Sequence, residues 1–373
     1  MKDRKERRTS AIIFPLGPYH PALSQPVALT LRLRDDVISE VAPPQMGYCR
    51  RGIAALAEGQ PIADALAIVE RSCALAGATY RQALCLAIED ATQTEASQRG
   101  RLTRTLFNEV ARLLARLWTL GQGAHAAELP ALWHAALDQR EHLFAALVRS
   151  TGERAYWAVA EPGGARLDLT LEPLREILER LAPAVNGWRV ATAGGPLGRA
   201  TAKIGATPLR QLQALGLPGI GADATPNGDL RRVKRLLDGY RDLPASAWPE
   251  EADAPAQGDS WDVGASLRFA AYDLMVSHAL ALACLARLDD VHGAIKTDVA
   301  PRNAEGRATV QGPHGPVTVE IALSARGRVE LLRLTTPCAA TVAALPQLLT
   351  GHTLAEAPLL LTALDLCLEC ADL

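Results

Sequence analysis

ERSCALAGATY, at residues 70–80, is the most informative stretch of this 373-residue chain. It lies in a region of high helix propensity that begins at Pro61, a favourable first residue of a helix, and that continues to about residue 91. In such a helix Cys73 shares one face with Ala76 and Tyr80, because residues at helical spacing are neighbours. The sequence therefore predicts a long helix with a thiol near its middle.

The last residues carry a second candidate feature, the Cys-x-x-Cys pair of Cys367 and Cys370. Thiolates hold soft metal ions, and this spacing lets two sulfurs from one turn reach the same ion. A single pair is equally consistent with two buried thiols near a helix end. Cys73 adds a third thiol from a distant part of the chain. Two interpretations follow: a pocket that binds a metal or a soft substrate such as a sulfur species, or a relic in which the thiols only pack.

The other four cysteines are Cys49, Cys85, Cys284 and Cys338. They lie in apolar or turn settings, and we expect them to be small packing residues. Seven scattered cysteines in a chain of this length do not form a disulfide framework. Their pattern indicates a reducing compartment.

The high content of Ala, Leu and Arg predicts many helices, and short alternating segments predict strands near both ends of the chain. We expect helices over residues 102–120, 129–149, 172–181, 230–240, 265–288, 339–349 and 357–364, and strands over residues 27–33, 37–41, 309–311, 317–323 and 329–334. The expected organisation is a disordered basic tail (1–11), an N-terminal β unit (12–60), a helical core (61–300) with a loop-rich insertion near 187–260 and a linker at 252–259, and a C-terminal part (301–373) with β strands, short helices and the Cys-x-x-Cys tail.

Charge and hydropathy exclude several classes of protein. Lys and Arg total 39 against 41 for Asp and Glu, and no long run of like charge indicates nucleic-acid binding. No stretch approaches the ~20 apolar residues that span a bilayer, and the start of the chain has too short an apolar run for a signal peptide. We therefore expect a cytoplasmic protein.

Several separated motifs resemble one known superfamily, in the same order. GPYHPAL (17–23) and GYCRRG (47–52) resemble the opening of membrane-bound, energy-converting NiFe hydrogenases and of the complex I 49 kDa subunit. ERSC (70–73) with CLAIE (85–89) resembles the segment that carries the first Cys-x-x-Cys pair. GPLGRA (195–200) resembles a Gly-Pro-x-x-Arg-Ala element, and residues 365–372 resemble the closing Asp-Pro-Cys-x-x-Cys.

The resemblance implies a set of metal ligands. In such hydrogenases four cysteines hold nickel, and the second cysteine of each pair also bridges to iron. By position, Cys73 and Cys367 would be terminal ligands and Cys370 a bridging ligand. The remaining position is Ala76, whose methyl group cannot coordinate a metal. The resemblance thus implies a degenerate nickel–iron site with three of four thiolates, and no cofactor is certain. Nickel-loaded relatives carry a clipped extension after this pair, and we expect none behind Leu373.

Other family positions are also changed. The His and Glu of the family's Gly-x-x-His-Arg-Gly-x-Glu stretch are absent at residues 47–54, and the helix His is Tyr80. The Arg that lies over the metals is replaced by His314. We therefore expect altered proton delivery and altered support of the ligands. The His and Tyr that bind the quinone headgroup in complex I correspond to Ser24 and Ala74, so quinone chemistry of that kind is not expected.

Two residues are candidates for a catalytic role. His314 lies in a Gly-Pro loop, where a histidine is either an ordinary surface residue or, at this family position, a polar group of the cavity. Arg199, in the GPLGRA element, is expected to pair with a buried carboxylate or with a neighbouring subunit. Both interpretations stay open for each residue.

The resemblance implies an α+β fold that is mainly α, with a central helical bundle, a small N-terminal β unit and a C-terminal β unit. It also implies a setting. Such large subunits pack against a small iron–sulfur subunit, similar to the complex I 20 kDa subunit, and the pair sits on membrane subunits that translocate ions or protons. We expect a peripheral subunit on the inner side of the cell membrane that acts in electron transfer coupled to ion or proton translocation. The alternatives are a non-catalytic assembly or coupling subunit, and a hydrogenase, sulfur-species reductase or quinone reductase with a modified site.

Overall fold

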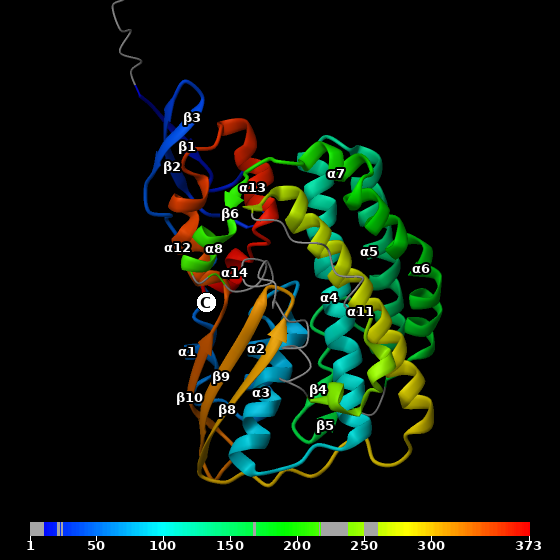
Figure 1. Cartoon of the computed structure of the whole chain (residues 1–373). Coiled ribbons are helices and arrows are strands. Elements are labelled where there is room, and N and C mark those ends of the chain that lie inside the picture. Colours follow the sequence, from blue (N-terminus) through cyan, green and yellow to red (C-terminus); the bar gives the residue numbers. More distant parts are fainter. Residues whose placement is uncertain are drawn as a thin grey trace, which may run out of the picture.

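Four long helices form the centre of the structure, because their sequences combine high helix propensity with a broad apolar face. They are α4 (Gln98–Ala126), α5 (Pro130–Thr151), α6 (Glu172–Ala193) and α11 (Val263–Asp290). The side chains of Ser97 and Asp262 cap α4 and α11 by accepting hydrogen bonds from backbone N–H groups of the first turn. In this computed structural model each of the four helices packs against two of the others (Figure 1), which confirms the predicted mainly α fold.

The structure describes residues 11–20, 23, 25–166, 169–215, 217, 238–249 and 260–373. The shorter helices are α1 (Ile53–Ala57), α2 (Ile62–Glu70), α3 (Gly77–Thr92), α7 (Pro196–Thr201), α8 (Leu209–Ala214), α12 (Cys338–Leu349), α13 (Ala357–Ala363) and α14 (Leu368–Ala371), with 3₁₀ turns η1 (Gly239–Asp242), η2 (Ala245–Ala247) and η4 (Leu354–Glu356). Two-residue strands pair as β4 (Ala160–Glu161) with β5 (Gly164–Ala165) and as β6 (Thr207–Pro208) with β7 (Ser260–Trp261). Nearly all of the expected basic tail, most of the expected helix at 230–240 and the whole expected linker at 252–259 lie outside the described residues.

Helix α11 is the one helix in the described part of the chain that is long and apolar enough to cross a membrane. It lies between α4 and α6, and most of its apolar window is buried inside the protein. The apolar character of α11 is therefore explained by its position in the core.

The N-terminal sheet has three antiparallel strands, β1 (Ile12–Leu16), β2 (Leu29–Arg34) and β3 (Val37–Val41), in that order. Alternate residues of β2 are buried, as expected for a strand with one face on the core. The predicted hairpin is β2 with β3. Strand β1 was not predicted, because its sequence IIFPL does not alternate between apolar and polar residues.

The C-terminal sheet has the order β10-β9-β8, formed by β8 (Ala304–Gly312), β9 (Gly315–Leu323) and β10 (Val329–Thr335). It packs against α3, and the two form one side of the molecule in Figure 1. Strand β8 pairs with β9 along its whole length, so the hairpin turn consists of Pro313 and His314. The turn was expected two residues later, at Gly315-Pro316. The observed register leaves His314 at the tip of a tight turn.

The prediction of a single helix from Pro61 to residue 91 is wrong at its centre. Helix α2 ends at Glu70 and α3 begins at Gly77, with turns between them. The side chain of Arg51 stabilises the break by donating hydrogen bonds of 2.7 Å to the backbone oxygens of Arg71 and Ser72. A helix would have used these oxygens itself, so an arginine distant in sequence replaces the local pattern. Cys73 consequently lies in a turn.

Other predicted boundaries also shift. Helix α6 continues twelve residues past its predicted end to Ala193, with Pro183 inside it. The region near 187–260 was predicted to be loop-rich, and it contains α7 and α8 among its described residues.

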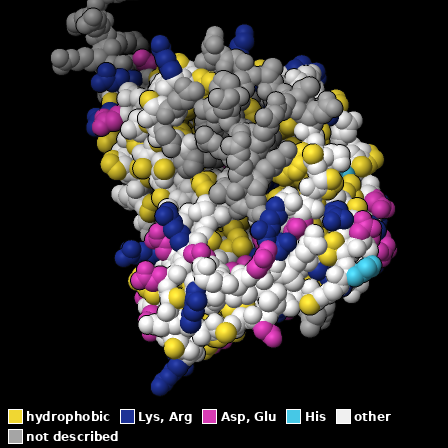
Figure 2. Space-filling model, turned by 60° about the horizontal axis from the view of Figure 1, so that its bottom comes forward, with side chains coloured by type: hydrophobic (Ala, Val, Ile, Leu, Met, Phe, Trp, Pro, Cys, Tyr) yellow, Lys and Arg dark blue, Asp and Glu magenta, His cyan; other side chains and the backbone are white. Residues whose placement is uncertain are grey.

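The surface carries charges of both signs. Acidic and basic side chains are interspersed among the described residues on the face shown in Figure 2.

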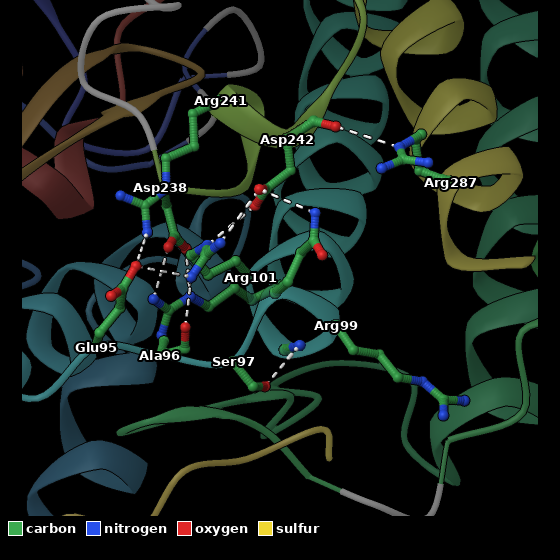
Figure 3. A network of polar contacts seen from close by, with 12 residues as sticks. Glu95, Ala96, Ser97, Arg99, Arg101, Asp238, Arg241, Asp242 and Arg287 are labelled. Carbon is green, nitrogen blue, oxygen red and sulfur yellow. Dashed lines mark hydrogen bonds and ion pairs between the residues drawn. The ribbon is translucent and has the colours of Figure 1, made fainter. Parts of the chain in front are cut away.

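Ion pairs join α4 to its neighbours, and Figure 3 shows those around Arg101. Arg104 of α4 forms a two-pronged pair with Glu89 of α3, at 2.7 and 2.9 Å, and also binds Asp238. Arg101, one turn earlier, binds Asp242 through Nε at 3.0 Å and Nη2 at 3.2 Å. Because the Arg104 side chain is only 1% exposed, loss of its charge would leave two buried carboxylates without a partner. These pairs hold α3 in register with the helical core.

Gly306 allows β8 to lie directly on α3, and we predict that Gly306→Ala destabilises the protein. A Cβ at Gly306 would lie 2.1 Å from the backbone oxygen of Ala87, so the strand or the helix would have to move. We expect a loss of about 1–3 kcal/mol in the free energy of unfolding, measured by urea denaturation. The control is Gly187→Ala in α6, where a Cβ meets nothing within 4 Å and the protein should be unchanged or stabilised by up to about 1 kcal/mol. Equal effects of the two substitutions would contradict this account of the packing.

Candidate functional site

Four buried cysteines from three separate parts of the chain converge between the helical core and the C-terminal tail. Cys73 lies in the turn between α2 and α3, Cys338 is the first residue of α12, and Cys367 and Cys370 flank the start of α14. The sulfur of Cys73 lies 3.3 Å from that of Cys367, and the sulfurs of Cys367 and Cys370 are 2.8 Å apart. Cys338 is buried in the same core cluster, on a helix that packs against α14. The three predicted thiols are thus together, and Cys338 lies in the core beside them.

Cys338 was expected to be a packing residue, and only the fold reveals its position. It has no nearby cysteine in the sequence, so spacing could not indicate it. Its place depends on how α12 packs against α14. The other cysteines of the chain, Cys49, Cys85 and Cys284, are all free.

His314 faces the same cluster from the β8–β9 turn. A ring nitrogen of His314 and the sulfurs of Cys73 and Cys367 all lie within 4.8 Å of one another. The Nδ1 atom is engaged by Asp365, at 3.1 Å from its backbone oxygen and 3.2 Å from its carboxylate Oδ2. The Nε2 atom is buried and has no hydrogen-bond partner among the described residues. The histidine therefore offers one free ring nitrogen to the thiols.

Asp365 is held from three directions. Arg116 of α4 donates a hydrogen bond to its Oδ2 at 2.5 Å, and Thr119 donates to its Oδ1 at 2.5 Å. Arg116 also binds Asp273 of α11 at 2.5 Å and the backbone oxygen of Pro313 in the β8–β9 turn. One buried arginine thereby joins the core, the turn that carries His314 and the start of the tail.

The electrostatics of this pair favour its charged form. Burial alone would raise the pKa of Asp365, but Arg116 and His314 lower it to about 2. Burial alone would lower the pKa of His314, but the carboxylate of Asp365 raises it to about 9. At neutral pH the side chain beside the thiols is therefore an imidazolium.

The contacts among the thiols shift their pKa values in opposite directions. The contact with the Cys367 thiol is the main cause that lowers the pKa of Cys73 well below the usual range of a thiol. Burial is the main cause that raises the pKa of Cys370, whose thiol donates a hydrogen bond to the sulfur of Cys367. Thiolate character is thus favoured on Cys73, next to the His314 cation.

The tail is fixed against the rest of the protein by polar contacts on either side of the thiols. Asp372 accepts hydrogen bonds from the backbone N–H groups of Gly47, at 2.9 Å, and Cys49, at 2.8 Å. Glu369 accepts from the N–H of Ala74 at 3.0 Å. These bonds hold Cys367 and Cys370 against the turn that carries Cys73.

The two remaining family positions behave differently. Ala76 is buried beside the cluster, and its N–H donates a hydrogen bond to the sulfur of Cys73 at 3.2 Å. Arg199 is exposed in α7 and donates to the backbone oxygen of Gly194 at 2.5 Å, so it is not brought to the thiols.

A small pocket of about 30 Å³ lies beside His314, and Trp118 and Gln122 are among the residues that line it.

No protein-family model matches the chain. An NADH-quinone oxidoreductase subunit of Azorhizobium caulinodans is 30% identical over 233 residues, which cover 58% of this chain and 55% of that protein. An F(420)H(2) dehydrogenase subunit of Methanosarcina mazei is 26% identical over 251 residues, covering 65% of this chain and 66% of that protein. The chain thus matches between about half and two thirds of the length of these relatives.

A solved structure extends the similarity over the whole fold. A chain of the membrane-bound sulfane sulfur reductase (MBS), described as an archaeal respiratory membrane complex, matches with a TM-score of 0.85. The match covers 98% of this chain and 99% of that chain at 22% sequence identity. The two chains therefore share their fold.

We predict that Asp365→Asn changes how stability depends on pH, in protein freed of metal by a chelator. In the wild type the Asp365–His314 pair contributes fully between the ordinary pKa values of 3.8 and 6.5. Its contribution is lost as the pH rises through about 9, where the imidazolium loses its proton, and as the pH falls through about 2. The difference in free energy of unfolding between wild type and Asp365→Asn should shrink by about 3 kcal/mol as the pH rises from neutral to above 9.

The matched control for this measurement is Asp138→Asn. Asp138 forms an exposed pair with His142, at 3.4 Å, and its loss should leave the pH dependence of unfolding unchanged. A constant difference between wild type and Asp365→Asn across this pH range would show that Asp365 does not hold the proton of His314.

Proposed function

Because the chain belongs to the superfamily of the complex I 49 kDa subunit, we propose that it is the large subunit of a membrane-attached, complex I-like oxidoreductase complex. Within that complex it would act in electron transfer that is coupled to ion or proton translocation. The observation that carries the proposal is the buried group of thiols with the His314–Asp365 pair beside it. A cluster of polarised thiols next to a proton-carrying histidine is suited to redox chemistry.

The donor set does not fit the binuclear nickel–iron centre of the hydrogenases. That centre needs two thiolates in each of two Cys-x-x-Cys pairs, and the second position of the first pair is Ala76. At this position the backbone N–H of Ala76 donates a hydrogen bond to the sulfur of Cys73, and the side chain offers no second thiolate. Hydrogen evolution by the nickel–iron route is therefore not part of the proposed activity.

The acceptor that the site supports best is a thiophilic one, of the sulfane-sulfur class. Three converging thiols interact well with sulfur chains, and a protein of the same fold is a chain of a complex named as a sulfane sulfur reductase. Reduction of one S–S bond takes two electrons and two protons and yields two thiols. The electrons would come from an iron–sulfur partner, and His314, with its pKa near 9, would hold a proton beside the reacting sulfur.

The proposed partners are a small iron–sulfur subunit and ion- or proton-translocating membrane subunits, on the inner side of the cell membrane. The loop that Asp372 of the tail fixes through Gly47 and Cys49 has features of a contact surface. Tyr48 in this loop is 43% exposed. Exposed aromatic residues on a fixed loop are typical of protein interfaces.

The test is to purify the complex from membranes through a tag on this chain and to follow oxidation of reduced viologen. We expect an iron–sulfur protein and membrane proteins to co-purify, and oxidation to require a sulfane-sulfur acceptor such as polysulfide rather than protons or a soluble quinone. Cys367→Ser should reduce the rate at least tenfold, or about 1.4 kcal/mol or more in the activation free energy. Cys284→Ser, which changes a buried cysteine of α11 away from the cluster, should retain the wild-type rate.

Three outcomes would contradict the proposal. Hydrogen evolution with reduced viologen would point to a working nickel–iron site. Equal rates in Cys367→Ser and wild type would favour the alternative of a non-catalytic subunit that assembles the complex or couples it to the membrane. Failure of any iron–sulfur protein to co-purify would remove the proposed electron donor.

A further inference from the structure

A second small pocket, of about 20 Å³, lies between α4, α5 and the segment that leads from Cys73 into α3. A space of this size holds one water molecule or one ion of similar size. Leu75 lines this pocket and also the pocket beside His314, so the two are neighbours. The other apolar side chains of the lining include Leu114, Phe144 and Trp157. The pocket is thus a small, largely apolar space next to the cavity of the thiols.

The guanidinium of Arg140 on α5 lines this pocket in a fixed position. Its Nε donates a hydrogen bond of 3.1 Å to the backbone oxygen of Leu114. Its Cζ lies 4.8 Å from the ring centroid of Trp118 and 5.4 Å from that of Phe144. A guanidinium that is held by a backbone acceptor and two aromatic rings keeps its remaining N–H groups in a defined direction.

Arg140 lacks an anionic partner among the described residues. Its only hydrogen bond there is the one from Nε, so both terminal nitrogens remain available. The adjacent carboxylate of Glu141 is engaged on both oxygens by Arg154, at 2.7 and 2.6 Å. Glu70, the carboxylate of the pocket lining, is bound to Arg81 at 3.2 Å. Burial and the neighbouring Arg154 lower the pKa of Arg140 to about 10, as expected for a cation whose charge is not balanced.

The size and lining of the pocket select the kind of anion. Apolar walls favour a monovalent anion that loses its hydration easily, and the space admits a single heavy atom. Hydrosulfide meets both conditions, whereas a chain of several sulfurs is too long. Hydrosulfide is also the end product of sulfane-sulfur reduction, because HSS⁻ takes up two electrons and one proton to give two HS⁻ ions.

We propose that the pocket at Arg140 binds one small monovalent anion of the hydrosulfide class and receives the anionic product from the neighbouring cavity of the thiols. The terminal N–H groups of Arg140 would donate to the anion, and the aromatic and aliphatic side chains would exclude water around it. The link to sulfur rests on the proposed function. The anion site itself follows from Arg140 and the pocket alone.

The experiment uses the full chain, freed of metal by a chelator, at a pH where hydrogen sulfide is ionised. The melting temperature is measured by circular dichroism while sodium hydrosulfide replaces sodium gluconate at constant ionic strength. An anion that binds the folded state alone raises the melting temperature with its occupancy, so the measurement yields a dissociation constant. We expect a rise that saturates. A second series with sodium chloride distinguishes a site for the product from a site for halide, and we expect chloride to bind more weakly.

Two variants test the pocket independently. Arg140→Gln removes the charge, and we expect it to weaken hydrosulfide binding at least tenfold. Ala78→Val adds two carbons to a side chain of the pocket lining and keeps Arg140, and it should weaken binding as well because the space is filled. Arg149→Gln is the matched control, since it removes the same charge from the same helix at an exposed pair with Glu176, and its dissociation constant should equal that of the wild type. The spectrum of each variant before heating checks that it is folded.

Several results would overturn the inference. They are a melting temperature that does not respond to hydrosulfide, equal dissociation constants in wild type and Arg140→Gln, or tighter binding of chloride than of hydrosulfide. None of them affects the viologen assay of the complex, so failure of the anion site and failure of the proposed function can be distinguished. Conversely, hydrosulfide binding through Arg140 in a chain whose complex lacks reductase activity would support the anion site and contradict the proposed reaction.

Discussion

The carboxylate of Asp365 is the contact on which the arrangement of the site depends. It lies at the point where the tail leaves α13, and it binds Arg116 and Thr119 of α4 as well as His314 of the β8–β9 turn. Three parts of the fold that are far apart in the sequence thus meet at one charged group. A buried carboxylate without these partners would cost several kcal/mol, so the tail has one favourable position. That position brings Cys367 and Cys370 to Cys73.

The parts of the fold that follow local rules could be predicted from the sequence. Long helices such as α4 and α11 have a clear apolar face, and β2 and β9 alternate along their length. The break between α2 and α3 follows a different rule. Local propensity favours a continuous helix there, but Arg51 takes the backbone oxygens that the helix would have used. A side chain that is close only in the folded protein cannot be found from the pattern of residues 61–91.

The same distinction applies to the site. Cys367 and Cys370 could be found from their spacing, and Cys73 from the motif around it. Cys338 is near no other cysteine in the sequence, and the packing of α12 on α14 brings it into the same core cluster. Arg199 shows the opposite case, since its motif matches the family but its side chain is exposed and donates to the backbone oxygen of Gly194, at the end of α6. A motif identifies a position in a fold, whereas the partners of that position decide its chemistry.

The donors that meet in this cavity limit what it can hold. Cys73, Cys367 and Cys370 supply three thiols, and a ring nitrogen of His314 lies within 4.8 Å of the sulfurs of Cys73 and Cys367. Ala76 contributes a backbone N–H to the sulfur of Cys73 and no thiolate. Two Cys-x-x-Cys pairs that face each other would present four sulfurs, and this cavity replaces one of them with a methyl group beside a buried histidine. The donor set therefore differs from that of a binuclear thiolate centre in the position nearest to His314 and Asp365.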